Sequence, residues 1–194
     1  MTRIIAGDAS SLRMKVPERG TRPTSDRVRE AIFSALDAWN YLTDTRVLDL
    51  YAGSGALGVE ALSRGAEHAT FVEKHAPTAK IIDENFAAAH TAISAAGRTI
   101  THSIYTQSVQ KFLIAHPPVA PELRYDVVFI DPPYDFSDAV IAENLASLTP
   151  LLKADALVMI ERSKRSPEPA MPQSLRIMKR KNYGETSCWW AERI

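Results

Sequence analysis

The residues best suited to chemistry in this sequence are Asp131-Pro-Pro-Tyr134, which follow an apolar, β-branched run over residues 125–130. Proline has no backbone N–H, so this corner offers carbonyl oxygens as acceptors beside the Asp131 carboxylate. Two neighbouring acceptors match the two N–H donors of an exocyclic amino group, and Tyr134 offers a face on which an extruded base can stack. The corner therefore predicts chemistry on the amino group of a nucleobase, although a rigid turn with an ordinary packed tyrosine has the same sequence.

A glycine-rich loop, Gly53-Ser-Gly-Ala-Leu-Gly58, follows a second apolar run over residues 46–51. Gly53 and Gly55 allow a tight turn and a close approach of the backbone to a ligand. The helix expected over residues 56–64 presents unpaired N–H groups at its start. The same spacing is typical of dinucleotide-binding proteins, and it also fits a strand-to-helix turn without a ligand.

Two carboxylates narrow the choice of ligand. Asp49 lies in the strand end, where it can face an ammonium group or water, and we expect it to have a partner because burying an unpaired carboxylate is costly. Glu73 ends a further strand over residues 69–73, where it can accept both hydroxyls of a ribose. S-adenosylmethionine offers an ammonium group and a ribose, whereas a dinucleotide brings a pyrophosphate that Asp49 would repel.

These two sites together predict methyl transfer to an amino nitrogen. That nitrogen is a weak nucleophile because its lone pair is delocalised into the ring. When Asp131 and the Pro132 carbonyl accept its hydrogens, the nitrogen can pyramidalise and attack a methyl sulfonium in line, and orientation supplies much of the rate. No general base with a tuned pKa is evident, so we expect proton loss to follow methyl transfer.

Strand-like and helix-like segments alternate along the chain. Apolar runs predict strands at residues 46–51, 69–73, 100–105, 125–130 and 156–160, and helical spacing predicts helices at 28–39, 56–64, 76–90, 109–115 and 137–148. This alternation indicates a doubly wound α/β fold, whose ligands bind at the carboxyl ends of the strands. Residues 175–181 and 186–191 should form an antiparallel pair, with Trp189 and Trp190 on an edge strand, one in the core and one on the surface.

Composition excludes several classes of protein. The 194 residues are 45% apolar and 24% charged, which fits one folded domain with a real core. No apolar run reaches the ~18–20 residues of a membrane span, and no signal-peptide pattern is present. Because Cys188 is the single cysteine, the chain can form neither an internal disulfide nor a metal site built of several thiolates. The five histidines lack metal-ligand spacing. We therefore expect a cytoplasmic protein that needs no metal.

A net charge of zero hides two basic ends. Residues 1–30 carry seven Lys/Arg against four Asp/Glu (+3), and residues 161–181 carry seven against two (+5). Residues 31–160 carry eight against fifteen (−7). If the basic ends meet in space, they form a patch suited to a polyanion such as nucleic acid; solvated surface charge is the alternative.

The chain resembles the RsmD family of bacterial 16S rRNA (guanine-N2)-methyltransferases, which are class I S-adenosylmethionine-dependent enzymes. Four stretches carry the resemblance: Arg3-Ile-Ile-Ala-Gly7, Thr21-Arg-Pro-Thr-Ser-Asp-Arg-Val-Arg-Glu30, residues 47–65 and Asp131-Pro-Pro-Tyr134. Tyr183-Gly-Glu185 also fits the closing hairpin of the family. The resemblance implies a Rossmann-like, mostly parallel seven-stranded sheet with helices on both faces and an antiparallel C-terminal hairpin.

The resemblance also implies roles for single residues. Those that bind S-adenosylmethionine, and later its product S-adenosylhomocysteine, would be Arg22, Pro23, Thr24, Asp49, Tyr51, Gly53, Gly55, Glu73, Ser108 and Asp131. Ser108, after Gln107, stands where the family usually has Asn or Asp at the adenine. The catalytic residues would be Asp131 and Pro132 on the amino group and Tyr134 on the base.

The implied substrate is 16S rRNA within a partly assembled small ribosomal subunit, and the implied target is the family's methylation site, guanine 966. The enzyme would act as a monomer. A basic extension, residues 1–23, would cover the cofactor as a lid and contact RNA phosphates through Arg3, Arg13, Lys15 and Arg19. Residues 24–194 would form the methyltransferase domain. Where the family usually has a Trp-Arg-Gly-Arg-like run, this chain reads Asp8-Ala-Ser-Ser-Leu-Arg13.

Other functions remain open from the sequence. A DNA adenine-N6 methyltransferase shares the Asp131 corner, but 194 residues leave little room for a target-recognition domain. A catalytically idle RNA-binding module that holds S-adenosylmethionine would not need that corner, and a nicotinamide oxidoreductase is the most distant alternative. Arg27 and Arg29 fit either surface ion pairs with Asp26 or Glu30, or contact with substrate.

Overall fold

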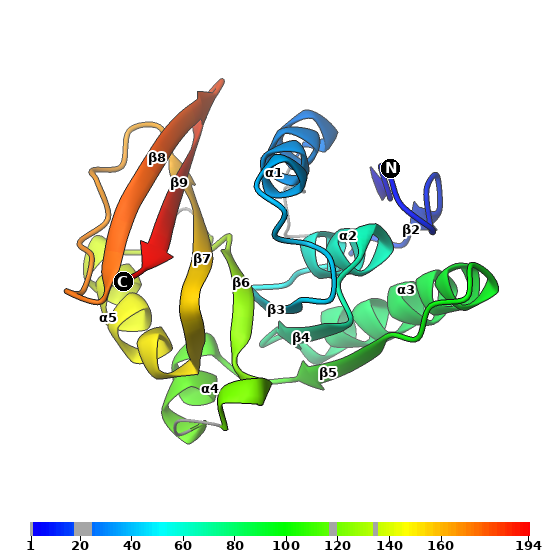
Figure 1. Ribbon diagram of the computed structural model, residues 1–194. Helices are drawn as coiled ribbons and strands as arrows, with labels where there is room; N and C mark the ends of the chain where they lie inside the picture. The colour runs from blue at the N-terminus through cyan, green and yellow to red at the C-terminus, as the bar shows by residue number, and fades with distance from the viewer. Residues whose placement is uncertain (1, 18–24, 117–119, 134–135) are drawn as a thin grey trace.

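The computed structural model describes residues 2–17, 25–116, 120–133 and 136–194 (Figure 1). The elements in chain order are β1 (Thr2–Arg3), β2 (Arg13–Met14), α1 (Asp26–Ala38), β3 (Arg46–Leu50), α2 (Ala56–Arg64), β4 (His68–Val72), α3 (Ala76–Ala95), β5 (Thr101–Tyr105), α4 (Val109–Ala115), β6 (Tyr125–Ile130), α5 (Asp138–Leu148), β7 (Leu152–Ser163), β8 (Leu175–Tyr183) and β9 (Thr186–Arg193). The alternation of strands and helices predicted from the sequence is confirmed.

Seven strands form one sheet in the order β5-β4-β3-β6-β7-β9-β8. The first five strands in that order are parallel, and β9 is antiparallel to both β7 and β8. The predicted α/β class, with its antiparallel C-terminal hairpin, is confirmed. The chain moves outward from β3 in both directions, and Leu50 at the end of β3 lies opposite Ile130 at the end of β6. The glycine loop and the Asp131 corner therefore leave the sheet side by side, at its switch point.

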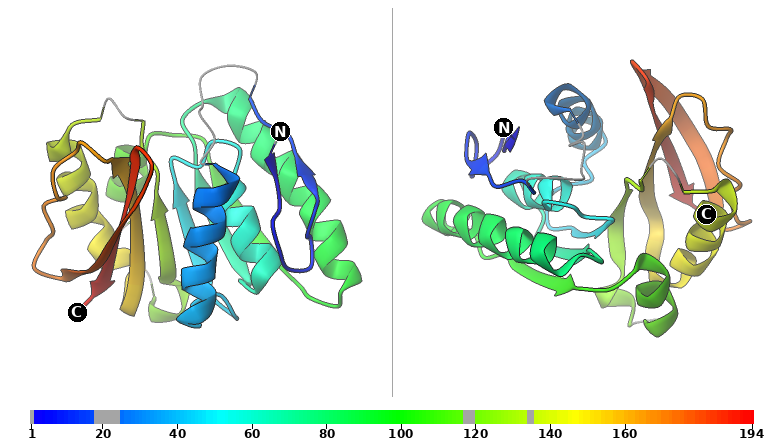
Figure 2. Two further views of the ribbon diagram at one scale, coloured as in Figure 1. Left: turned by 90° about the horizontal axis from the view of Figure 1, so that it is seen from above. Right: turned by 180° about the vertical axis from the view of Figure 1, so that it is seen from behind.

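The sheet is covered on both faces (Figure 2). Residues of α1, α2, α3 and the N-terminal segment pack on one face, and residues of α4 and α5 pack on the other. Trp190 belongs to the first core and Trp189 to the second, and their residues are 2% and 3% exposed. Our prediction for this pair is wrong on two counts, because β9 lies between β7 and β8 and is not an edge strand, and because both of its faces pack into a core.

Several element boundaries differ from those predicted. Helix α3 continues to Ala95, past the predicted end near His90, and the chain leaves it at Gly97, whose φ is +85°. Strand β7 begins at Leu152 and ends at Ser163, beyond the predicted 156–160, because β9 pairs with it as far as Ser163. No helix in the part of the chain described is long and apolar enough to cross a membrane.

The N-terminal segment forms a small hairpin, β1–β2, which the sequence did not predict. Ile4 and Met14 are buried in the core beside α1 and α2. The Glu60 carboxylate on α2 accepts hydrogen bonds from the backbone N–H groups of Ile5 (2.7 Å) and Ala6 (3.1 Å). These contacts fasten the hairpin to the domain. The predicted domain boundary after residue 23 lies outside the described residues and stays a prediction.

Candidate active site

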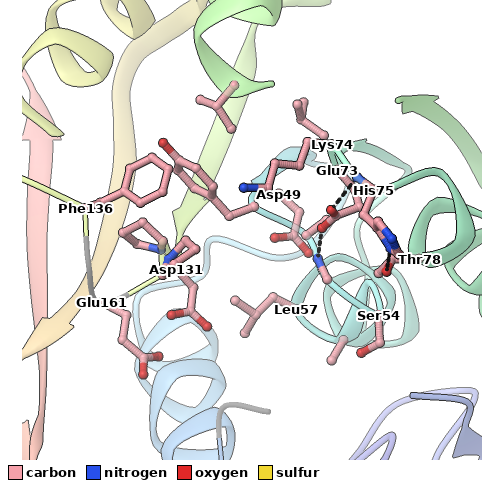
Figure 3. Close-up of a pocket in the computed structure, with 18 of the residues that line it drawn as sticks. Asp49, Ser54, Leu57, Glu73, Lys74, His75, Thr78, Asp131, Phe136 and Glu161 are labelled. Carbon is pink, nitrogen blue, oxygen red and sulfur yellow. Dashed lines mark hydrogen bonds between the residues drawn. The ribbon is translucent and has the colours of Figure 1, made fainter. Parts of the chain in front are cut away.

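A cleft of about 930 Å³ opens where β3, β4 and β6 end, beneath the start of α1 and the β8–β9 turn. Of the residues predicted to act, it is lined by Asp49, Tyr51, Gly53, Glu73, Ser108, Asp131 and Pro132. Figure 3 shows the carboxylates of Asp131 and Glu161 on one side of this cleft and that of Glu73 toward the glycine loop. The structure thus brings both predicted chemical sites into a single space.

Asp49 is buried at the end of β3, with the residue 1% exposed. Its Oδ2 atom accepts a hydrogen bond from the backbone N–H of Gly58 at 2.9 Å, in the first turn of α2. This N–H group is a partner that the sequence argument did not name. Burial, with smaller contributions from the negative charges of Asp131 and Glu73, raises the pKa of Asp49 well above its usual value, whereas the Gly58 bond opposes the shift.

Glu73 follows directly after β4 and binds the glycine loop. Its Oε2 atom accepts a hydrogen bond from the N–H of Gly53 at 3.0 Å, and its Oε1 atom accepts one from the N–H of His75 at 2.8 Å. Each carboxylate oxygen has a second lone pair that remains available to a hydroxyl group. The position and orientation of Glu73 are therefore fixed before a ligand arrives.

Glycine is required at the three positions of the loop for different structural reasons. Gly53 and Gly55 have φ values of +54° and +78°, in the left-handed region that favours glycine. A Cβ atom on Gly53 would meet no atom within 4 Å, so its backbone borders open space in the cleft. A Cβ atom on Gly58 would lie 2.3 Å from the Phe71 ring. Gly58 is therefore needed for packing of α2 on β4.

We expect Gly58→Ala to destabilise the protein, because the new methyl group overlaps the Phe71 ring. Overpacking of this kind costs about 1–3 kcal/mol of unfolding free energy. Chemical denaturation measures this loss, and Gly58→Ala/Phe71→Leu should recover part of it. A single variant as stable as the wild type would contradict this account of the glycine.

Tyr51 and Ser108 connect the cleft to the helices beneath it. The Tyr51 hydroxyl accepts a hydrogen bond from the Asn144 side chain on α5 at 2.6 Å, and its ring lies edge-on to Phe136 at 5.3 Å. Ser108 caps α4, and its Oγ atom accepts a hydrogen bond from the N–H of Lys111 at 3.3 Å. Both side chains thus have structural partners in addition to the cofactor roles that the resemblance implies.

Glu161 is the main acidic residue of the cleft that sequence reasoning missed. It lies on β7 and is 4% exposed. Because Ile160 pairs with Ile130, Glu161 lies beside Asp131 on the neighbouring strand (Figure 3). The available signal was a glutamate directly after the apolar run 156–160. Phe136 and Tyr183 also line the cleft and were not predicted to do so.

The predicted RNA-contact residues of the N-terminal segment do not share one environment. Arg3 and Arg13 are exposed and lie opposite each other in the β1–β2 hairpin. Lys15 forms an ion pair with Glu84 at 2.8 Å, and both side chains are exposed. The predicted site residues Arg19, Arg22, Pro23, Thr24 and Tyr134 lie outside the described residues.

Arg29 has a structural role. Its residue is 0% exposed, its guanidinium pairs with Asp26 at 2.9 Å, and it donates a hydrogen bond to the backbone oxygen of Arg3 at 2.6 Å. Burial lowers its pKa. Of the two readings left open by the sequence, the structure supports the ion pair with Asp26, but this arginine is buried and not on the helix surface as that reading supposed.

The β1–β2 hairpin of the first basic end and the β8–β9 hairpin of the second do not form one patch. Figures 1 and 2 show α1 between the β1–β2 hairpin and the β8–β9 hairpin. These two hairpins therefore do not meet, whereas Arg27 of α1, which also belongs to the first basic end, lines a hollow together with Tyr183. The two basic hairpins are separate surfaces on opposite sides of α1.

A family model described as Conserved hypothetical protein 95 matches residues 2–192, almost the whole chain. The chain belongs to this family, the RsmD family. The family predicted from the four sequence stretches is therefore confirmed.

Curated members of the RsmD family are similar to this chain over nearly their full length. Ribosomal RNA small subunit methyltransferase D of Haemophilus influenzae is 36% identical over 186 residues, covering 95% of this chain and 90% of the relative. The protein of the same name from Escherichia coli K12 is 31% identical, covering 95% and 86%. The solved structure of yhhF from Escherichia coli has a TM-score of 0.80 at 30% identity, covering 99% and 97%. The predicted Rossmann-like methyltransferase fold is confirmed.

Proposed function

We propose that this protein transfers a methyl group from S-adenosylmethionine to the exocyclic N2 of a guanine in 16S rRNA of the small ribosomal subunit. The observation that carries the proposal is the convergence of the Asp131-Pro132 corner and the Gly53 loop on one cleft. The names of the two RsmD relatives, small subunit rRNA methyltransferases, support the choice of RNA.

The residues of the cleft fit S-adenosylmethionine. Asp49, Glu73, Asp131 and Glu161 give the lining an acidic character that suits a cationic ligand and disfavours a pyrophosphate. Glu73 has lone pairs for the ribose hydroxyls, and Gly53 borders open space. When bound, S-adenosylmethionine supplies an electrophilic methyl group. Asp49 would bind near its amino-acid end, as would Gly55, and Ser108 near its adenine.

Asp131 and Pro132 would do the chemical work on the acceptor. The Asp131 carboxylate and the Pro132 carbonyl accept the two hydrogens of the guanine amino group and turn its lone pair toward the methyl donor. Phe136 contributes aromatic surface in the same cleft, next to Tyr51. Tyr134 would stack on the base, and the proton leaves after transfer.

Cofactor binding should depend on pH through Asp49. A bound ammonium group favours the carboxylate, so binding should release a proton when the unliganded Asp49 is protonated. Affinity for S-adenosylmethionine should therefore rise with pH, from the usual carboxylate range up to the raised pKa of Asp49. The stability of the unliganded protein should fall over the same range, because a raised pKa in the folded state stabilises it only at low pH.

Calorimetric titration in two buffers of different protonation enthalpy measures this proton release. Asp49→Asn should abolish it and weaken binding. Glu84→Gln, a neutralised carboxylate on the exposed side of α3, serves as the control. Equal proton release by wild type and Asp49→Asn would contradict the assignment.

The substrate is tested with radiolabelled S-adenosylmethionine and four acceptors: naked 16S rRNA, small subunits lacking the modification, large subunits and duplex DNA. We expect label in small-subunit material. Label in duplex DNA alone would favour an adenine-N6 methyltransferase. Cofactor binding without label in any acceptor would favour an idle RNA-binding module.

A cytoplasmic monomer that acts on a partly assembled small subunit is part of the same proposal. Comparing naked 16S rRNA with assembled particles reports the preferred form of the substrate. Size-exclusion chromatography with light scattering reports the oligomeric state, and a mass near 21.4 kDa is expected.

A further inference from the structure

Strand β8 is the most basic element at the edge of the sheet. Lys179 and Lys181 lie opposite Trp190 and Cys188 of β9, so both lysines point to the face of the sheet that carries α1. The Lys179 ammonium lies 5.4 Å from the ring centre of Trp39, at the end of α1. Both lysines are exposed, and neither forms an ion pair within the described part of the chain.

This basic face leads to the cleft. Strand β8 runs toward Tyr183, which lines the cleft, and the Lys181 ammonium lies 5.2 Å from the ring centre of Tyr183. At ~3.3 Å per residue, Lys179 to Tyr183 spans about 13 Å. A smaller hollow beside the cleft is lined by Arg27 of α1 on one side and by Tyr183 on the other. Arg27 is exposed, and we call Arg27, Lys179 and Lys181 the hairpin track.

The charges of the track and the cleft are opposite. The cleft lining contains the carboxylates of Glu73, Asp131 and Glu161 against the ammonium group of Lys74, and this excess of negative charge repels phosphate groups. An RNA that delivers a base to this cleft must therefore keep its backbone outside. Exposed cations beside an aromatic side chain are the arrangement by which proteins hold single-stranded nucleic acid.

We propose that the hairpin track binds the RNA backbone next to the target nucleotide, while the base alone enters the cleft. The proposal rests on the proposed function and adds a second RNA-contact surface, across α1 from the β1–β2 hairpin. Lysine on an edge strand also discourages pairing with other chains. That role requires no cation on α1, whereas Arg27 of α1 lines the hollow beside Tyr183, the residue that Lys181 contacts.

The test compares Lys179→Gln/Lys181→Gln with Lys80→Gln/Lys111→Gln, a pair of exposed lysines on α3 and α4 that carries the same change in net charge. The probe is unmodified 16S rRNA, titrated at several salt concentrations. At ~0.7 counterions per phosphate contact, the hairpin variant should lose about tenfold in affinity near 0.15 M salt. The salt slope should fall by about 1.4 in magnitude, and affinity for S-adenosylhomocysteine should stay at the wild-type value.

Two results would overturn the proposal: a hairpin variant that keeps the wild-type affinity and slope, or the same loss in both pairs, which would reflect net charge alone. Glutamine keeps much of the lysine stem, and circular dichroism reports whether each variant is folded. Methyl transfer by the wild type to the same RNA is scored separately. Methylation together with an unaffected hairpin variant would refute only the track, whereas no methylation of any RNA would refute the proposed function and the proposal that rests on it.

Discussion

Replacing Asp131 with alanine should reduce methyl transfer by about 10²–10³-fold, the range found when an oriented polar group is removed from a reaction centre. The reason is that only the Pro132 carbonyl would then remain to hold the amino group. Affinity for S-adenosylhomocysteine should stay near the wild-type value, because the product does not depend on the orientation of the acceptor. Single-turnover kinetics and calorimetry measure the two quantities separately.

Asp131→Asn serves as the conservative variant, since its amide oxygen keeps one acceptor, and it should retain more activity than Asp131→Ala. Asp83→Ala, at an exposed position on α3, should leave both quantities unchanged. If Asp131→Ala kept most of its turnover, the amino-group mechanism would be wrong. Loss of cofactor binding together with turnover would instead assign Asp131 to the cofactor.

Replacing Glu73 with alanine should weaken binding of S-adenosylmethionine by about 10–100-fold, because hydrogen bonds to a charged group contribute about 1.5–3 kcal/mol. Two effects combine: the ribose loses its acceptor, and the Gly53 loop loses the hydrogen bond that fixes it at 3.0 Å. Calorimetry with S-adenosylhomocysteine measures the change.

Glu67→Ala is the matched control, since Glu67 is exposed just before β4, at the opposite end of that strand. Glu73→Gln should lie between wild type and alanine. Turnover at saturating cofactor should recover in Glu73→Ala, because the acceptor site is intact. Wild-type affinity in Glu73→Ala would show that the ribose binds elsewhere.

The sequence predicted the adjacency of the two chemical sites because it follows from topology. Asp131 comes directly after the buried strand β6, and the loop that contains Gly53 follows the buried strand β3. Parallel strands end at one edge of a sheet. In the structure Leu50, at the end of β3, pairs with Ile130, at the end of β6, so the two sites begin side by side. Glu161 could not be found in the same way, since its place beside Asp131 depends on the pairing of Ile160 with Ile130.

The sequence predictions were wrong or incomplete where contacts between residues far apart in the chain determine the position or burial of a residue. Trp189 and Trp190 alternate across β9 as expected, but each face of the sheet packs into a core at this strand, so neither is exposed. The β1–β2 hairpin has only two residues in each strand, and its position depends on bonds to Glu60, far along the chain. Arg29 fits a surface helix position by its spacing, yet α1 turns it into the core beside Arg3. None of these contacts leaves a periodic signal.

The most direct test of the account is identification of the methylated nucleoside. Small-subunit RNA labelled by the protein would be digested to nucleosides and analysed by chromatography with mass spectrometry. The account predicts N2-methylguanosine in the wild-type reaction and its loss with Asp131→Ala. N6-methyladenosine, or a methyl group on a ring carbon or ribose, would contradict the assignment of the cleft to the guanine amino group.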